Sequence, residues 1–115
     1  MTSTSNNISE FITEKVNKIK QEFDELAVQF TLGKAEASDR FQELKKELND
    51  KAVEWKNTIK SNSAKSTETT KTILEHLQVQ AALGKAEAKE AFDIQRKKLN
   101  QLLSKLEVEL KKDKK

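Results

Sequence analysis

The segment Leu-Gly-Lys-Ala-Glu-Ala occurs twice in this chain, at residues 32–37 and 83–88, so that the two copies start 51 positions apart. The similarity continues on both sides without a gap. Six further residues recur at the same spacing: Leu26, Val28, Gln29, Phe41, Leu48 and Asn49 in the first copy, and Leu77, Val79, Gln80, Phe92, Leu99 and Asn100 in the second. A repeat of this length is typical of one structural unit copied once, where a single copy is too slender to bury a core. The sequence therefore predicts two similar halves, with convergence of two Lys/Glu/Ala-rich segments as the alternative.

The composition predicts helices in one domain. The chain has 115 residues, no proline, only two glycines, and charged and hydrophobic fractions of 36% and 35%. Such a profile is typical of helices and argues against sheets and loop-rich folds. Five Phe and one Trp are the only large aromatic groups, so we expect the apolar residues to be buried along a stripe on each helix. The predicted fold class is all-α.

Apolar residues recur every three or four positions, which is the spacing of a coiled-coil-like stripe on a helix. One stripe extends from Ile12 to Ile59 and a second from Leu74 to Leu110. The polar stretch between them is rich in Ser and Thr, which favour turns and helix caps. The sequence thus predicts two long antiparallel helices that form a helical hairpin. Its expected parts are a disordered leader over 1–7 and a single hairpin domain over 8–115, made of a helix over 8–60, a turn over 61–68 and a helix over 69–112.

Gly33 and Gly84 fall inside the two predicted helices. Because the first stripe keeps its phase across Gly33, we favour continuous helices, in which a glycine allows a neighbour to approach closely. The alternative is that both glycines end helices, which would give four short helices in a monomer. The residues expected in close helix packing are Gly33, Ala37, Gly84 and Ala88.

A second set of apolar residues lies away from the stripes. At about 100° per residue, Val28 and Leu32 fall on the side of the first helix opposite its stripe. A two-helix hairpin has little core of its own, so we expect two chains to associate into a four-helix bundle that covers this second set. The interaction candidates are Val28, Leu32, Ala35, Val79, Leu83, Ala86 and Ile94.

The residue types needed for catalysis or metal binding are nearly absent. The sequence has no Cys, no Tyr and a single His, His76, which leaves nucleophile–base pairs and zinc ligand sets almost without candidates. Each glycine stands alone, so there is no Gly-rich phosphate loop. We therefore predict that the protein is not an enzyme and has no catalytic residue, metal or cofactor.

These observations favour a structural or interaction protein. We expect a self-associating scaffold or adaptor that binds itself, as a homodimer, and a further protein partner. The alternative is an amphipathic-helix binder of a membrane, lipid or storage-granule surface. Arg96, Lys97, Lys98 and the basic tail give little support for nucleic-acid binding, because no basic face or interleaved aromatic residues accompany them. The lack of cysteine and of a secretory signal favours a cytoplasmic location.

Overall fold

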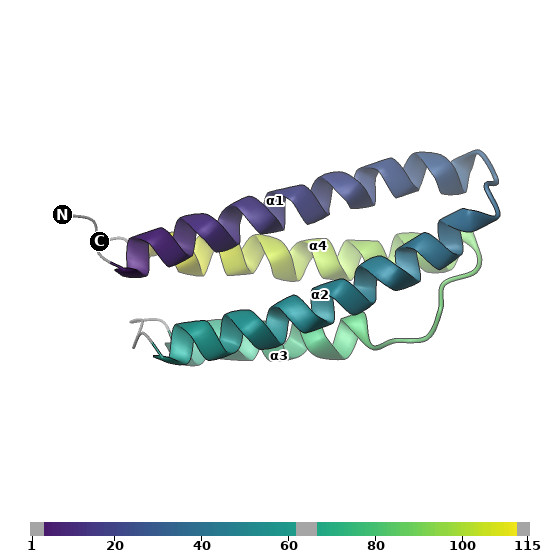
Figure 1. Cartoon of the computed structure of the whole chain (residues 1–115). Helices are drawn as coiled ribbons and strands as arrows, with labels where there is room; N and C mark the ends of the chain where they lie inside the picture. Colours follow the sequence, from purple (N-terminus) through teal and green to yellow (C-terminus); the bar gives the residue numbers. More distant parts are fainter. Residues whose placement is uncertain (1–3, 62–66, 113–115) are drawn as a thin grey trace.

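The computed structural model describes residues 4–61 and 67–112. Over these residues the chain forms four α-helices and no strand, which confirms the predicted all-α class (Figure 1). None of the described helices is long and apolar enough to cross a membrane. The helices are α1 (Thr4–Thr31), α2 (Glu36–Ser61), α3 (Thr67–Ala81) and α4 (Lys89–Lys112).

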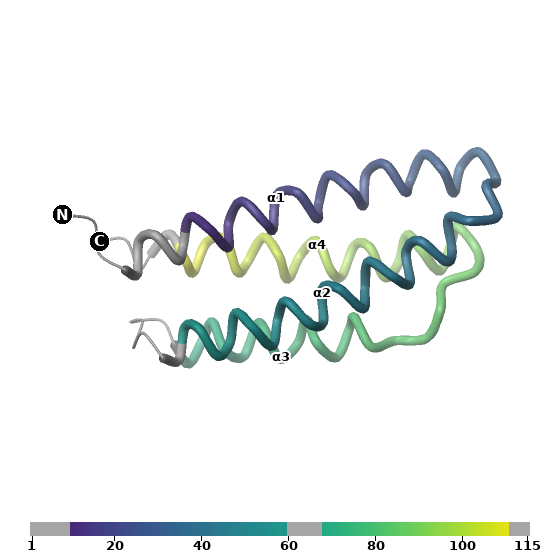
Figure 2. Tube along the Cα trace, viewed as in Figure 1, coloured from purple at the N-terminus to yellow at the C-terminus, as the bar shows by residue number. Residues whose placement is uncertain are grey.

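The four helices are arranged as an antiparallel bundle. Each helix packs against its two neighbours in the order α1, α2, α3, α4 and back to α1, so α1 lies diagonally opposite α3. The connections 32–35 and 82–88 lie together at one end, here called the loop end (Figure 2), whereas the start of α1 and the end of α4 lie at the other (Figure 1). Each copy of the sequence repeat is therefore one helical hairpin, either α1–α2 or α3–α4.

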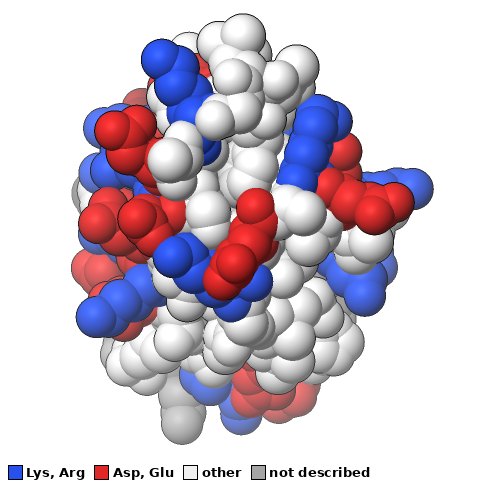
Figure 3. Space-filling model, turned by 90° about the vertical axis from the view of Figure 1, so that its right-hand side faces the viewer, with Lys and Arg blue, Asp and Glu red and all other residues white. Residues whose placement is uncertain are grey.

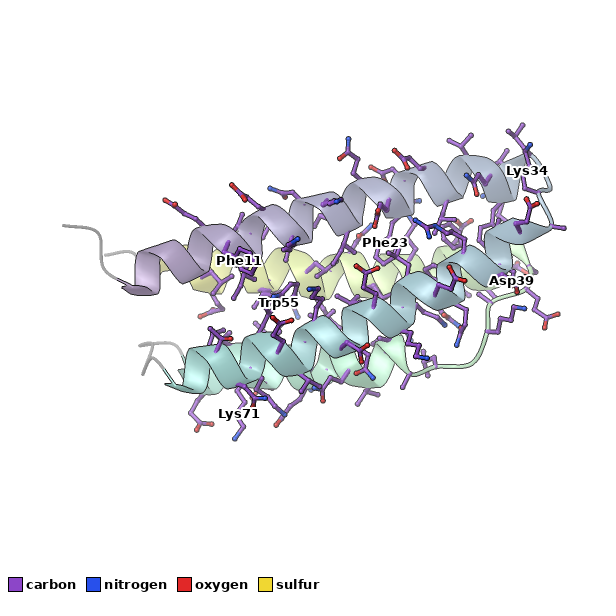
Figure 4. All side chains as sticks on the ribbon, in the orientation of Figure 1. Phe11, Phe23, Lys34, Asp39, Trp55 and Lys71 are labelled. Carbon is purple, nitrogen blue, oxygen red and sulfur yellow. The ribbon has the colours of Figure 1, made fainter. Side chains whose placement is uncertain are left out.

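The apolar stripes form the core, because the stripe of each helix faces the bundle axis. Phenylalanine rings meet in the half of the core toward the loop end. Phe41 contacts Phe23 and Phe92 edge-on, with ring centroids 5.7 and 4.7 Å apart, and Phe30 stacks on Phe92 at 4.3 Å. Trp55 fills the core farther from the loops and is only 1% exposed (Figure 4). The other residues of this core cluster are Ile12, Val16, Ile19, Leu26, Leu44, Leu48, Ala52, Ile59, Ile73, Leu74, Leu77, Ala86, Leu99, Leu103, Leu106 and Leu110.

The predicted continuous helix over 8–60 is wrong, because the chain turns at Gly33. Gly33 has a φ of 74°, a left-handed conformation that glycine adopts without the steric cost of a Cβ. The Gly33 amide donates to the Phe30 carbonyl at 3.1 Å, and the Lys34 amide donates to the Gln29 carbonyl at 3.0 Å. This is the hydrogen-bond pattern of a Schellman helix end. The stripe keeps its phase because both helices face the same core, so phase does not separate a continuous helix from a hairpin.

The predicted helix over 69–112 is interrupted as well, by the connection 82–88. The four short helices considered as the alternative are thus the ones observed. The molecule measures 49 × 23 × 18 Å, whereas one helix over 8–60 would be ~80 Å long. A four-helix bundle forms within one chain and needs no second copy to complete it. Dimerisation remains a prediction.

The outer boundaries also differ from the prediction. α1 begins at Thr4, so the expected disordered leader over 1–7 is wrong from this residue onward, and the part before it lies outside the described residues. The expected turn over 61–68 also lies mostly outside the described residues, between the end of α2 at Ser61 and the start of α3 at Thr67.

The two glycines are expected to respond oppositely to alanine. Alanine at Gly33 must adopt the left-handed conformation, so Gly33→Ala should lower the free energy of unfolding by about 1–2 kcal/mol. At Gly84, φ is not positive and an added Cβ would meet no atom within 4 Å. Gly84→Ala should therefore be neutral, or stabilise by roughly 0.4–1 kcal/mol through the unfolded chain. Urea unfolding measures both effects.

Asparagine provides the control for this prediction. Gly33→Asn should be more stable than Gly33→Ala, because asparagine tolerates the left-handed region better. If Gly33→Ala and Gly84→Ala lowered the free energy of unfolding equally, the left-handed turn at Gly33 would be contradicted.

Candidate interaction site at the loop end

The same six residues adopt two conformations at the loop end. In the first copy the helix resumes at Glu36. The equivalent residue of the second copy, Glu87, is still irregular, and α4 begins only at Lys89. Because the six residues are identical, their surroundings decide which conformation forms.

The alanine that enters the core also differs between the copies. Ala37 is buried and Ala35 is exposed in the first copy, whereas Ala86 is buried and Ala88 is exposed in the second. The buried position has therefore moved by two residues along the repeated segment. This displacement follows from the longer irregular connection before α4.

A difference in side-chain volume accounts for part of this change. Phe30, which stacks on Phe92, has the small residue Ala81 as its repeat equivalent. The second copy therefore has no ring at this position, and Ala86 belongs to the core cluster. Close packing favours the exchange, because an empty volume would remove van der Waals contacts from its lining.

Side chains of α2 hold the connection 82–88. The Ser38 hydroxyl donates to the Ala86 carbonyl at 2.8 Å. Lys85 forms a hydrogen-bonded ion pair with Asp39, and this hydrogen bond and the carboxylate charge raise the pKa of the Lys85 ammonium. Over the described part of the chain, no side chain of another helix makes a hydrogen bond to the connection 32–35.

Lys45 of α2 makes the central contact with this loop. Its side chain is fully buried. The ammonium donates to the carbonyls of Leu83 at 3.0 Å and Gly84 at 2.9 Å, and to Gln95 Oε1 at 2.6 Å. These three acceptors match the three N–H groups of an ammonium and compensate in part for its removal from water. Burial lowers the pKa of Lys45, because desolvation disfavours the charged form.

The repeat equivalent of Lys45 makes a different contact. This residue is Arg96, and its guanidinium donates to the Asp24 carboxylate of α1 at 2.6 Å. Asp24 belongs to α1 and not to the connection 32–35. Among the described side chains, none that is basic donates to the carbonyls of the tight turn in the first copy.

Lys45, Ser38 and Gln95 are not among the site residues predicted from the sequence. Their repeat equivalents are Arg96, Lys89 and Leu44, so the copies differ at each of these positions. A position-by-position comparison of the two copies is the signal that could have found them, because the contacts that distinguish the two loops must come from residues that differ.

Most of the predicted interaction residues are exposed. Ala86 is buried, so its prediction as a surface residue is wrong; the irregular loop turns it into the core. Contact of the others with a partner remains a prediction. Their exposed fractions are 58% for Val28, 66% for Leu32, 61% for Val79, 37% for Leu83 and 57% for Ile94, and Ala35 is exposed as well.

Of the four small residues predicted to lie in close contacts between helices, only Ala37 is buried. A Cβ built on Gly33 or Gly84 would meet no atom within 4 Å, so neither glycine allows a close approach. Ala88 is exposed, whereas Ala37 is buried. The physical reason is that both glycines belong to connections at the end of the bundle.

The exposed aliphatic side chains lie at different corners of the bundle. At about 100° per residue, Val28 and Leu32 lie opposite the core residues of α1, and Val79 lies opposite those of α3. Since α1 and α3 are diagonal, these two sets face away from each other along the helices. A single partner can contact both at the loop end, where Leu32 and Leu83 belong to the two connections. Figure 3 views this end and shows an uncharged band that runs between charged groups.

Charges of both signs accompany this band. The first connection contains the exposed residue Lys34 and is followed by the exposed Glu36, and the second contains the exposed residues Lys85 and Glu87. The loop end therefore combines exposed aliphatic side chains with balanced charge.

No family model, curated protein or solved structure matches this chain. Within residues 4–61 and 67–112, no group of three or more His, Cys, Asp or Glu side chains is placed to hold a metal ion.

Proposed function

We propose that this chain is a non-enzymatic interaction protein that associates with itself through the loop end. The observation that carries the proposal is the exposure of Leu32 and Leu83, together with Val28 and Val79, outside a core to which they do not belong. Fully burying such a side chain contributes about 1.5–3 kcal/mol. Scattered aliphatic residues are common on protein surfaces, but here both halves of the repeat carry them at the same positions.

The charges of the loop end favour a second copy as the partner. Each repeat places one exposed Lys two residues before one exposed Glu, as in Lys34 and Glu36 or Lys85 and Glu87. A copy related by a two-fold axis can place a Lys against a Glu, and isologous association requires such self-complementarity. An anionic membrane or a nucleic acid would instead be attracted by a positive excess. The dimer would leave its helix faces free for a further protein, as in a scaffold or adaptor.

Sedimentation of the double variant Leu32→Glu with Leu83→Glu tests this proposal. We expect wild type to sediment at high micromolar concentration as a dimer of about 26 kDa, twice the chain mass of 13.1 kDa. The variant should sediment as a monomer with unchanged helicity, because association would bury two carboxylates per chain without partners.

The matched control is Val53→Glu with Val108→Glu. These residues are also aliphatic, 43% and 52% exposed, and lie in the half of the bundle away from the loops. The control should therefore dimerise like wild type.

A wild-type chain that stays monomeric at the highest concentration would overturn the self-association. The same variants would then be tested on neutral and anionic lipid vesicles. Vesicle binding that is lost only when Leu32 and Leu83 are changed would support the alternative function, binding to an apolar surface.

A further inference from the structure

We propose that residues 82–88 form a conformational switch, whose second state is the tight turn that the same six-residue segment forms at 32–37. Both conformations occur in one molecule, so each is accessible to Leu-Gly-Lys-Ala-Glu-Ala. This inference concerns the single chain and stands apart from the proposed self-association.

The first copy defines the second state. In that state Gly84 would adopt the left-handed conformation of Gly33, and α4 would begin at Glu87, as α2 begins at Glu36. Ala88 would then replace Ala86 in the core, following the burial of Ala37 in the first copy. The change is therefore local and leaves the order of the four helices intact.

Three residues of α2 hold the present state, and we call them the latch residues: Ser38, Asp39 and Lys45. They contact the loop through the Ala86 carbonyl, the Lys85 ammonium, and the carbonyls of Leu83 and Gly84, respectively. The tight turn at 32–35 has no equivalent hydrogen bonds from the side chains that the structure describes. Withdrawing the latch contacts should therefore favour the tight turn.

A partner can compete for the ion pair between Lys85 and Asp39. The side chains of Lys85 and Asp39 are 42% and 68% exposed, so a basic partner group that pairs with Asp39 competes directly with the loop. Such a partner would shift the population toward the tight turn, because it binds that state more strongly.

The effect of alanine at Gly84 reports which state is populated. In wild type, Gly84→Ala is expected to be neutral or slightly stabilising. The variant Ser38→Ala with Lys45→Met removes two latch donors but keeps the apolar stem of the lysine. In this background Gly84 should become left-handed, and Gly84→Ala should lower the ratio of folded to unfolded chain by about tenfold. NMR backbone shifts of Glu87 and Ala88 should become helical.

Arg96→Met is the matched control, because Arg96 is the repeat equivalent of Lys45. The cost of Gly33→Ala should be the same with and without this change.

If the variant with Lys45→Met does not fold, Ser38→Ala with Asp39→Asn provides the same test at positions that are not fully buried. Two results in the variant that folds would together overturn the proposal. Gly84→Ala would change the ratio of folded to unfolded chain as little as it does in wild type, and the NMR shifts of Glu87 and Ala88 would remain non-helical.

Discussion

Replacing Phe41 by alanine is expected to lower the free energy of unfolding by about 3–5 kcal/mol, the cost typical of removing a buried aromatic ring. Phe41 is fully buried, and its ring contacts those of Phe23, Phe30 and Phe92. These rings belong to α1 and α4, so one substitution on α2 weakens the packing of three helices. The ammonium of Lys45 also lies 5.1 Å from the centroid of the Phe41 ring and would lose this cation–π contact.

Phe11→Ala is the control for this effect. Phe11 is 51% exposed, and its ring contacts the ammonium of Lys15 at 5.7 Å. Its removal should change the free energy of unfolding by no more than about 0.5 kcal/mol, as is usual at exposed positions. Urea unfolding of the two variants measures the difference. Similar losses in both would show that the aromatic cluster does not form the core.

Lys45→Ala is expected to cost about 2–4 kcal/mol, although lysine is usually a surface residue. The variant loses a fully buried stem and leaves the Leu83 carbonyl and Gln95 Oε1 without their donor, whereas the Gly84 carbonyl keeps only the hydrogen bond from Gln95 Nε2 at 3.2 Å. Lys46→Ala is the matched control, because the neighbouring Lys46 is exposed and should tolerate the change. A cost below that of Lys46→Ala would contradict the role given to Lys45.

The difference in stability between wild type and Lys45→Ala should also depend on pH. Burial lowers the pKa of Lys45 in the folded state from its ordinary value of 10.5. Between the lowered value and 10.5 the unfolded chain binds more protons at this residue than the folded chain does, so the free energy of unfolding rises with pH. Lys45→Ala lacks this rise, and the difference should widen toward pH 10.5. If the difference in the free energy of unfolding narrowed as the pH rises toward 10.5, folding would favour the charged ammonium of Lys45.

The helices and their buried faces could be predicted from the sequence because helical periodicity is a local signal. Val16, Phe23 and Leu48 follow the predicted stripe, and all are buried. The turn at Gly33 could not be deduced from the same signal. Two antiparallel helices that share a core continue the same spacing across a short turn, and glycine occurs both in helices and at their ends.

The second loop could be predicted even less, because it depends on contacts that are distant in sequence. Nothing within residues 83–88 differs from 32–37. The surroundings do differ: Lys45 and Ser38 of α2 contact the second loop, and Ala81 occupies the position of Phe30. Hence Ala86 was expected on the surface and is buried. The exposure of Val28 followed from its position on the predicted helix, which needs no knowledge of distant residues.

Each copy of the repeat is a hairpin closed at its Leu-Gly-Lys-Ala-Glu-Ala segment. The most direct test is the distance between spin labels at Gln21 of α1 and Lys46 of α2, two exposed positions, with labelled chains diluted into unlabelled ones. The hairpin places these residues on adjacent antiparallel helices, whose axes lie about 8–10 Å apart, so we predict a label separation below ~25 Å. A separation near ~38 Å, the length of a continuous helix between the two positions at 1.5 Å per residue, would contradict the hairpin.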